Sequence, residues 1–200
     1  MQREEAIIII GALVRGMLAR KKVALKLRNI PHILEVEVKG ADNLNNSNHY
    51  IALSAIPDAY VLVNVLREET KKLRTTSFEC LSACRTSTSL QSYNPRWSEG
   101  VRLTNMGPGY IVFNVFSQGL LSGDNFLGQA GIDLCKFPEI YKQKTADVVL
   151  PLSSSLAYPV YSSDGTKVIV STGSVEGRGS ISVSIRVPSI YRNMVSSTDN

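Results

Sequence analysis

The chain has 200 residues, of which 44% are hydrophobic and 20% charged, and its formal net charge is +5. These proportions are ordinary for a globular protein, and the length is sufficient to bury a substantial core. The charge is unevenly spread, because residues 1–30 hold seven basic and two acidic side chains whereas residues 31–200 hold 15 of each sign. A neutral body argues against an extended nucleic-acid-binding surface, so we expect no nucleic-acid partner.

The sequence contains no catalytic constellation. Its three cysteines, Cys80, Cys84 and Cys135, are too few for a disulfide framework and indicate a reducing compartment. Together with the two histidines, His32 and His49, they do not form a metal-ligand spacing. No nucleophile motif is accompanied by a base, and no glycine-rich phosphate loop occurs. We therefore expect a protein that is not an enzyme and that needs neither a cofactor nor a metal.

Residues 1–30 predict a basic amphipathic helix that ends before Pro31. Its apolar side chains recur at three- and four-residue steps, namely at Ile7, Ile10, Val14 and Met17/Leu18. The apolar run "AIIIIGALV" is shorter than the roughly 20 residues that a bilayer requires, and no small-residue cleavage site follows it. We expect neither a signal peptide nor a membrane anchor, and a cytoplasmic protein, either free or at a membrane surface.

From residue 31 onward the sequence has the pattern of β-strands. Leu34, Val36 and Val38 alternate with charged residues, as in a strand with one buried face. Eight strands are predicted, over residues 32–44, 58–66, 85–91, 101–104, 110–116, 126–134, 146–152 and 180–187. Short strands separated by Gly, Pro, Asn and Ser predict an all-β antiparallel sandwich.

The predicted sandwich covers residues 31–188, with a polar, disordered tail at 189–200. Two insertions interrupt it, a charged segment at residues 67–83 and a longer segment at 153–179. The second insertion contains Asp164-Gly165 between β-prone runs, which is a strong signal for a tight hairpin.

Six segments in order resemble the C2 domain family: "LEVEVKGADNL" (34–44), "DAYVLV" (58–63), "YNPRWSE" (93–99), "YIVFNVF" (110–116), "DNFLGQAGIDL" (124–134) and "GSISVSIRV" (179–187). The resemblance implies an eight-stranded β-sandwich whose loops at one end commonly dock on phospholipid, often through calcium. The first and last of these segments are similar to the circular variant of the family called type II topology. Within this fold we expect Trp97 to be buried at a strand start and Gly128 to relieve crowding.

The resemblance also implies a calcium site, which this sequence has largely lost. The family's five aspartate positions fall on Ala52, Asp58, Ser117, Gly119 and Asn125, and Asp124 adjoins the last of them. Calcium takes six to eight oxygen ligands, several of them carboxylates. Two carboxylates leave the ion under-neutralised, so we expect a degenerate, calcium-independent site. Asp58 would then order its loop as a hydrogen-bond acceptor.

The family resemblance implies two other ways for the domain to bind a membrane or a partner. The first is a cationic surface on a pair of strands, which is weak here because Arg85 and Arg102 are its only charges. The apolar route uses the loop tips, where the candidates are Ile51, Leu53 and Ile56 on one loop and Leu120 and Leu121 on another. These side chains either insert into a membrane or contact a partner, or they fold back to cap the sandwich.

The segment "IGALVRGMLAR" is similar to the IQ motif, the helical segment that binds calmodulin and calmodulin-like light chains. The residues that fit the motif or supply its anchors are Ile10, Val14, Arg15, Gly16, Leu18 and Arg20. Gly11 takes the place of the motif's glutamine and lowers helix propensity by about 1 kcal/mol relative to alanine. Three roles stay open for this arm: binding a calmodulin-type partner, lying on a membrane as a basic helix, or packing against the sandwich.

The sequence therefore predicts a non-enzymatic adaptor, with a calcium-independent C2-like sandwich for protein or membrane interaction and an arm for a calmodulin-type partner. The alternative is a peripheral membrane module that docks on anionic phospholipid through the arm and the apolar loops. A conventional calcium-triggered domain is disfavoured by Ala52, Ser117, Gly119 and Asn125.

Overall fold

The computed structural model describes residues 31–44, 56–70, 76–106, 109–119, 123–137, 140, 145–170 and 179–188. The predicted helix at 1–30, the tail at 189–200 and the loop residues Ile51, Leu53, Leu120 and Leu121 lie outside these ranges. In the part of the chain that the structure describes, no helix has the length and hydrophobicity to cross a membrane.

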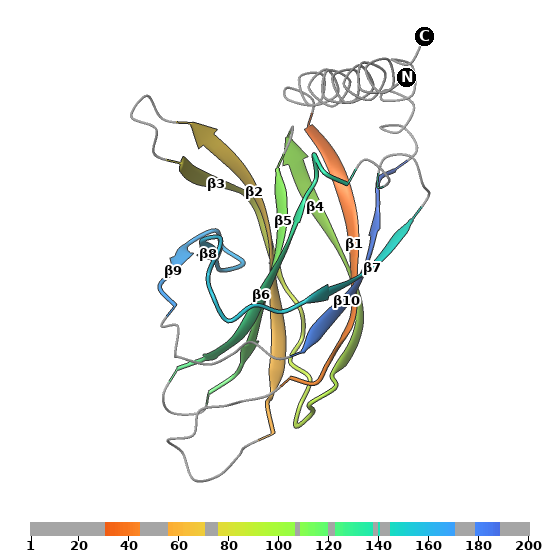
Figure 1. Cartoon of the computed structure of the whole chain (residues 1–200), viewed down its shortest axis with the longest axis vertical. Coiled ribbons are helices and arrows are strands. Elements are labelled where there is room, and N and C mark those ends of the chain that lie inside the picture. Colours follow the sequence, from red (N-terminus) through yellow and green to blue (C-terminus); the bar gives the residue numbers. More distant parts are fainter. Residues whose placement is uncertain are drawn as a thin grey trace, which may run out of the picture.

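Ten strands form the described fold, and they are arranged as two facing sheets with a small hairpin beside them (Figure 1). Their bounds are β1 Pro31–Asp42, β2 Ala59–Thr70, β3 Thr76–Arg85, β4 Arg96–Met106, β5 Tyr110–Ser117, β6 Asn125–Asp133, β7 Ala146–Pro151, β8 Val160–Tyr161, β9 Lys167–Val168 and β10 Ser180–Arg186. Sheet A has the order β4-β1-β10-β7 and sheet B the order β3-β2-β5-β6, while β8 pairs with β9. All of these pairs are antiparallel, so the predicted all-β antiparallel sandwich is confirmed.

The strand predicted over residues 85–91 is wrong. Arg85 ends β3, and residues 86–91 form a loop in which Ser89 makes one isolated bridge to Ala59 and Gln91 adopts a left-handed φ of 45°. The third strand lies earlier, at Thr76–Arg85, and pairs with β2 along its whole length. Within the segment predicted as an insertion at residues 67–83, residues 67–70 belong to β2 and residues 76–83 to β3. The β-prone residues of "TSFECLSAC" gain a continuous ladder partner there, whereas the polar residues after them make the isolated bridge from Ser89 to Ala59 and a bond from the Thr86 N–H to the Val61 carbonyl.

The strand count is ten instead of eight because the segment at 153–179 contains β8 and β9. The hairpin predicted at Asp164-Gly165 is confirmed, since it joins these two strands. Gly165 adopts a φ of +83°, the left-handed conformation that glycine tolerates best. The Asp164 carboxylate accepts the Thr166 backbone N–H at 2.9 Å and a bond from the Ser162 hydroxyl, which lower its pKa.

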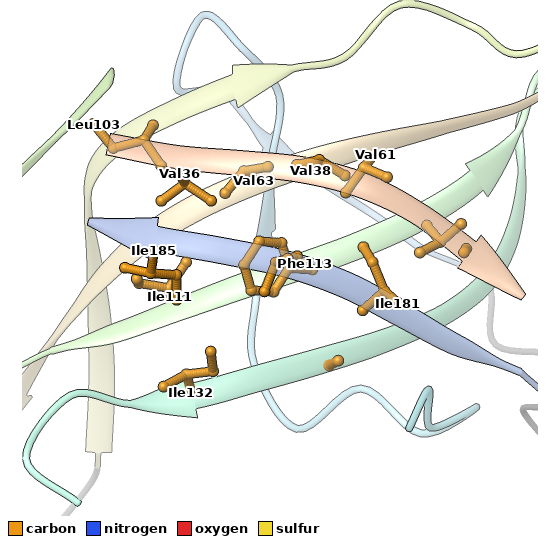
Figure 2. Close-up of a cluster of buried hydrophobic side chains, with 14 of the residues drawn as sticks. Val36, Val38, Val61, Val63, Leu103, Ile111, Phe113, Ile132, Ile181 and Ile185 are labelled. Atoms are coloured by element: carbon orange, nitrogen blue, oxygen red, sulfur yellow. The ribbon is translucent and has the colours of Figure 1, made fainter. Parts of the chain in front are cut away.

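The main core fills the space between sheets A and B. Figure 2 shows side chains from both sheets meeting there, with Phe113 of β5 in the middle and Val36, Ile181 and Ile185 of sheet A facing it. Trp97 is 8% exposed at the start of β4, as expected. A methyl group built on Gly128 would lie 2.9 Å from Leu152 Cβ, so the expected crowding is confirmed.

Sheet B is buried on both faces. Every residue of β2 from Ala59 to Leu66 and of β5 from Ile111 to Ser117 is buried. The face turned away from sheet A is covered by residues 153–170, which we call the strap and which contain β8 and β9 (Figure 1). Val160 of the strap packs there in a second, smaller apolar cluster with Tyr60, Leu62 and Phe116.

Candidate functional site

The candidate site is one end of the sandwich, which we call the loop end: residues 56–58, 86–95, 117–119 and 123–125. Strand β2 begins there, β5 ends and β6 begins, so Ser117 lies between Ala59 and Asn125 in the ladder. The Gln118 N–H donates to the Asp58 carbonyl at 2.8 Å. The fold therefore brings together the described residues of the degenerate calcium site, which are Asp58, Ser117, Gly119, Asp124 and Asn125.

The Asp58 carboxylate is engaged by the neighbouring loop. Its Oδ1 accepts the backbone N–H of Gln91 at 2.7 Å. The same loop is tied to the chain beside Asp58 by a bond from the Ser92 N–H to the Pro57 carbonyl at 3.1 Å. These contacts are those expected of an acceptor that orders its loop.

The Asp124 carboxylate is engaged through both of its oxygens. The Tyr60 hydroxyl donates to Oδ2 at 2.5 Å, and the Gly119 N–H donates to Oδ1 at 3.1 Å. The Tyr60 ring is buried and stacks on Phe116, with 5.6 Å between ring centroids. Burial, followed by the hydrogen bond to Asp124, raises the pKa of Tyr60 far above its usual value. The hydroxyl is therefore a permanent donor to this carboxylate at neutral pH.

A guanidinium group lies beside this pair. The Arg85 Cζ is 3.9 Å from the centroid of the Tyr60 ring, which is a cation–π contact. The Arg85 Nη2 also donates to Thr88 Oγ1 at 3.2 Å and to Gln118 Oε1 at 3.5 Å. The last residue of β3 thus places a positive charge on the ring whose hydroxyl bonds to Asp124.

The other positions of the degenerate site are structural. Ser117 is buried inside the ladder, and a methyl group built on Gly119 would lie 2.0 Å from the Gly123 carbonyl oxygen. Among the described residues, no group of three His, Cys, Asp or Glu side chains could hold a metal ion. No sequence motif points to the pairing of Tyr60 with Arg85. For Tyr60, the sequence offers one indication, which is a tyrosine directly after "DA" at the start of an apolar strand.

Three apolar side chains are exposed at the loop end. Leu90 is 73% exposed, Ile56 43% and Tyr93 38%. Only Ile56 is a candidate predicted from the sequence, because the pattern of residues 85–91 predicts a strand instead of a loop. Backbone bonds join the segments that carry these side chains, as Ala59 and Ser89 exchange N–H···O bonds of 2.8 Å. The described loop end therefore presents an apolar tip.

The two arginines of the cationic route are not brought together. Arg85 lies at the end of β3 in sheet B, whereas Arg102 lies on β4 in sheet A. Arg102 pairs with Glu35 at 3.4 Å, and Glu35 also contacts Arg186 at 3.4 Å. Arg102 is therefore paired with an acidic side chain, whereas Arg85 lies on the Tyr60 ring.

Comparisons with known proteins agree with this architecture. A family model described as "C2 domain" matches residues 32–152. The structure of a C2 domain of plant Extended Synaptotagmin 1 is similar, with a TM-score of 0.52 and 16% identity over 78% of this chain and 93% of that chain. Human GIVD cytosolic phospholipase A2 gives a TM-score of 0.51 and 15% identity over 80% of this chain, but only 16% of the phospholipase. No curated protein sequence matches the chain. At these identities the solved structures share the fold alone.

Proposed function

Because the chain belongs to the C2 domain family, we propose that it is a non-enzymatic interaction module whose loop end works without calcium and whose arm binds a calmodulin-type partner. C2 domains commonly mediate interactions with proteins or membranes. The observation that carries the calcium-independent part is the engagement of both loop-end carboxylates by donors of the protein itself.

Calcium binding at this end would have to undo those contacts. The ion prefers six to eight oxygen ligands and needs several carboxylates to offset its charge. It would compete with the Gln91 N–H for Asp58, and with the Tyr60 hydroxyl and the Gly119 N–H for Asp124. The Arg85 guanidinium lies on the Tyr60 ring, whose hydroxyl bonds to Asp124, so it adds a like charge to the neighbourhood of that carboxylate. Each of these contacts opposes calcium binding.

The exposed apolar tip favours a second candidate function, docking on a phospholipid surface. Leu90, Ile56 and Tyr93 project from the end of the sandwich, and the carboxylates near them are already engaged. Burying a fully exposed leucine contributes about 1.5–3 kcal/mol. Leu90 should therefore contribute most to reversible membrane binding, and the partly exposed Ile56 and Tyr93 less. The predicted candidates Leu53, which precedes Ile56 in the same connection, and Leu120 and Leu121, which lie between β5 and β6, are outside the described residues.

Binding of the whole chain to vesicles tests both proposals about the loop end, namely that it works without calcium and that its exposed apolar side chains dock on phospholipid. We expect the fraction that sediments with phosphatidylcholine–phosphatidylserine vesicles to be the same in calcium and in chelator. Leu90→Asp should weaken this binding about tenfold or more, because it removes roughly 2 kcal/mol of apolar burial.

Val149→Asp is the matched control, since Val149 is 65% exposed on β7, a strand of sheet A that is not part of the loop end. Its binding should equal that of the unchanged chain. Calcium-enhanced sedimentation, or a calcium-dependent rise in thermal midpoint, would contradict calcium independence. Equal weakening by both substitutions would remove the loop end as the docking surface, and an absence of vesicle binding would leave the protein-binding role alone.

The proposed role of the arm is tested by a gain of function. Gly11 occupies the glutamine position of the IQ-like segment, so Gly11→Gln restores a hydrogen-bonding side chain and raises helix propensity by about 1 kcal/mol. We expect Gly11→Gln in the full chain to tighten binding to immobilised calmodulin by about fivefold or more and to leave vesicle binding unchanged. Arg15→Glu combined with Arg20→Glu should abolish calmodulin binding. If Gly11→Gln strengthened only vesicle binding, the membrane role of the arm would hold instead.

A further inference from the structure

Three amide side chains form a row across the outer face of sheet B. Asn64 lies on β2, Asn114 on β5 and Gln129 on β6, and all three are buried. The Gln129 Nε2 donates to Asn114 Oδ1 at 2.7 Å, and the Asn114 Nδ2 donates to Asn64 Oδ1 at 3.0 Å. Burying three amides is costly unless their remaining donors and acceptors also find partners.

Those partners are main-chain groups of the strap. The Gln129 Oε1 accepts the N–H groups of Ala157 and Tyr158, both at 2.9 Å, and its Nε2 donates to the Tyr158 carbonyl at 3.0 Å. The Asn64 Oδ1 accepts the Tyr161 N–H at 3.0 Å, and its Nδ2 donates to the Tyr161 carbonyl at 2.8 Å. Gln129 and Asn64 therefore make five hydrogen bonds to the backbone of residues 157–161. Receptors for extended peptides also bind the main chain of their ligand.

Apolar contacts recognise the side chains of the same segment. Val160 is buried in the cluster of Tyr60, Leu62 and Phe116. The Tyr158 ring lies against the rings of Phe78 and Tyr110, with centroid distances of 5.6 Å and 5.0 Å. Backbone bonds give affinity, and these two sites for alternate side chains give a preference for an aromatic residue followed two positions later by an aliphatic one.

The strap is held by these side chains and not by strand pairing. Within the described residues, β8 pairs only with β9, and the one backbone bridge from the strap to sheet B is Gln129 with Ser153. Strands β2 and β5, by contrast, share eight consecutive paired positions. Elements outside the main ladder open at lower free energy than the sheets they cover.

We propose that the outer face of sheet B is a binding site for an extended peptide, which residues 157–161 occupy in the isolated chain. The ligand class is a segment of a partner protein with the pattern aromatic-Pro-aliphatic-aromatic, as in Tyr158-Pro159-Val160-Tyr161. Such a segment binds by displacing the strap, so the strap is an intramolecular competitor. This site lies on a sheet face and adjoins the loop end at Tyr60, whose ring packs with Val160 and whose hydroxyl donates to Asp124. The proposal does not rest on calcium independence of the loop end.

The test uses the full chain and a labelled peptide of residues 155–163. Val160→Asp should empty the site, because a carboxylate cannot be buried against Tyr60, Leu62 and Phe116. Fluorescence anisotropy should then show peptide binding at least about tenfold tighter than to the unchanged chain, whose tethered strap competes at an effective concentration near the millimolar range. Adding Gln129→Ala to Val160→Asp should abolish the binding, whereas Val149→Asp alone should not increase it.

Hydrogen exchange on the unchanged chain gives a second, independent measurement. The amides of Ala157, Tyr158 and Tyr161 should exchange at least about tenfold faster than those of β5, because the strap opens without the sheets. Exchange of strap and β5 amides at the same rate would overturn the proposal, since the strap would then be an inseparable part of the fold. A folded Val160→Asp variant that does not bind the peptide would overturn it equally.

Discussion

Replacing Asn114 by leucine should lower the free energy of unfolding by about 2–4 kcal/mol. Asn114 is the centre of the amide row, where it accepts from Gln129 and donates to Asn64 and to the Leu62 carbonyl. Leucine has a similar size but makes none of these bonds, and each buried amide group left without its partner costs about 1–3 kcal/mol. Urea unfolding followed by Trp97 fluorescence measures the change.

The control for Asn114→Leu is Gln118→Leu, which removes an amide from an exposed loop where water can replace its bonds. Its cost should stay below about 1 kcal/mol. A double-mutant cycle between Asn114 and Gln129 should show coupling, since the two side chains share a bond of 2.7 Å. A neutral Asn114→Leu variant would mean that the amide row contributes nothing to stability.

Phe113→Ala should have the largest effect on stability, about 3–5 kcal/mol. Phe113 is fully buried at the middle of the main core, where it faces Val36, Ile181 and Ile185 across the two sheets (Figure 2). Truncation removes the transfer free energy of the ring and leaves a cavity that a rigid sandwich cannot close. Since domains are stable by only about 5–15 kcal/mol, the variant should be near its unfolding transition at ambient temperature.

Denaturant unfolding and the thermal midpoint both measure the effect of Phe113→Ala. The matched control is Val149→Ala, which truncates an apolar strand residue that is exposed, and its cost should stay within about 0.5 kcal/mol. Similar losses for the two variants would contradict the placement of Phe113 between the sheets.

Local patterns were sufficient for most of the strands. The alternation of Leu34, Val36 and Val38 with charged residues predicted one buried face of β1, and all three are buried. The prediction over residues 85–91 failed because polar β-branched residues suit both an edge strand and a loop. Such residues form a strand only if a neighbouring strand pairs with them. Strand β2 pairs with Thr76–Arg85 instead.

The strap has an indirect signal in the sequence of the strands that it covers. The runs "YVLVNVL" and "YIVFNVF" are apolar at nearly every position, which indicates strands buried on both faces and not on one. Each run contains one asparagine as an exception, Asn64 in the first and Asn114 in the second. Asn64 bonds to Tyr161, 97 positions away in the sequence, and Asn114 bonds to Asn64, 50 positions away. An interpretation of residues 153–179 as an insertion does not reveal this relation.

The sequence by itself determined that the loop end has few carboxylates. A carboxylate that the sequence does not encode cannot bind calcium, whatever the fold. Ser117, Gly119 and Asn125 stand at positions where the family resemblance implies aspartates, and the sequence alone predicts the loss of those ligands. Only the tertiary structure decided what the two remaining acids do. Tyr60 and Asp124 are 64 positions apart, and Asp58 and Gln91 are 33 apart. No local periodicity encodes such contacts, because they exist only after long-range strand pairing has brought the loops together.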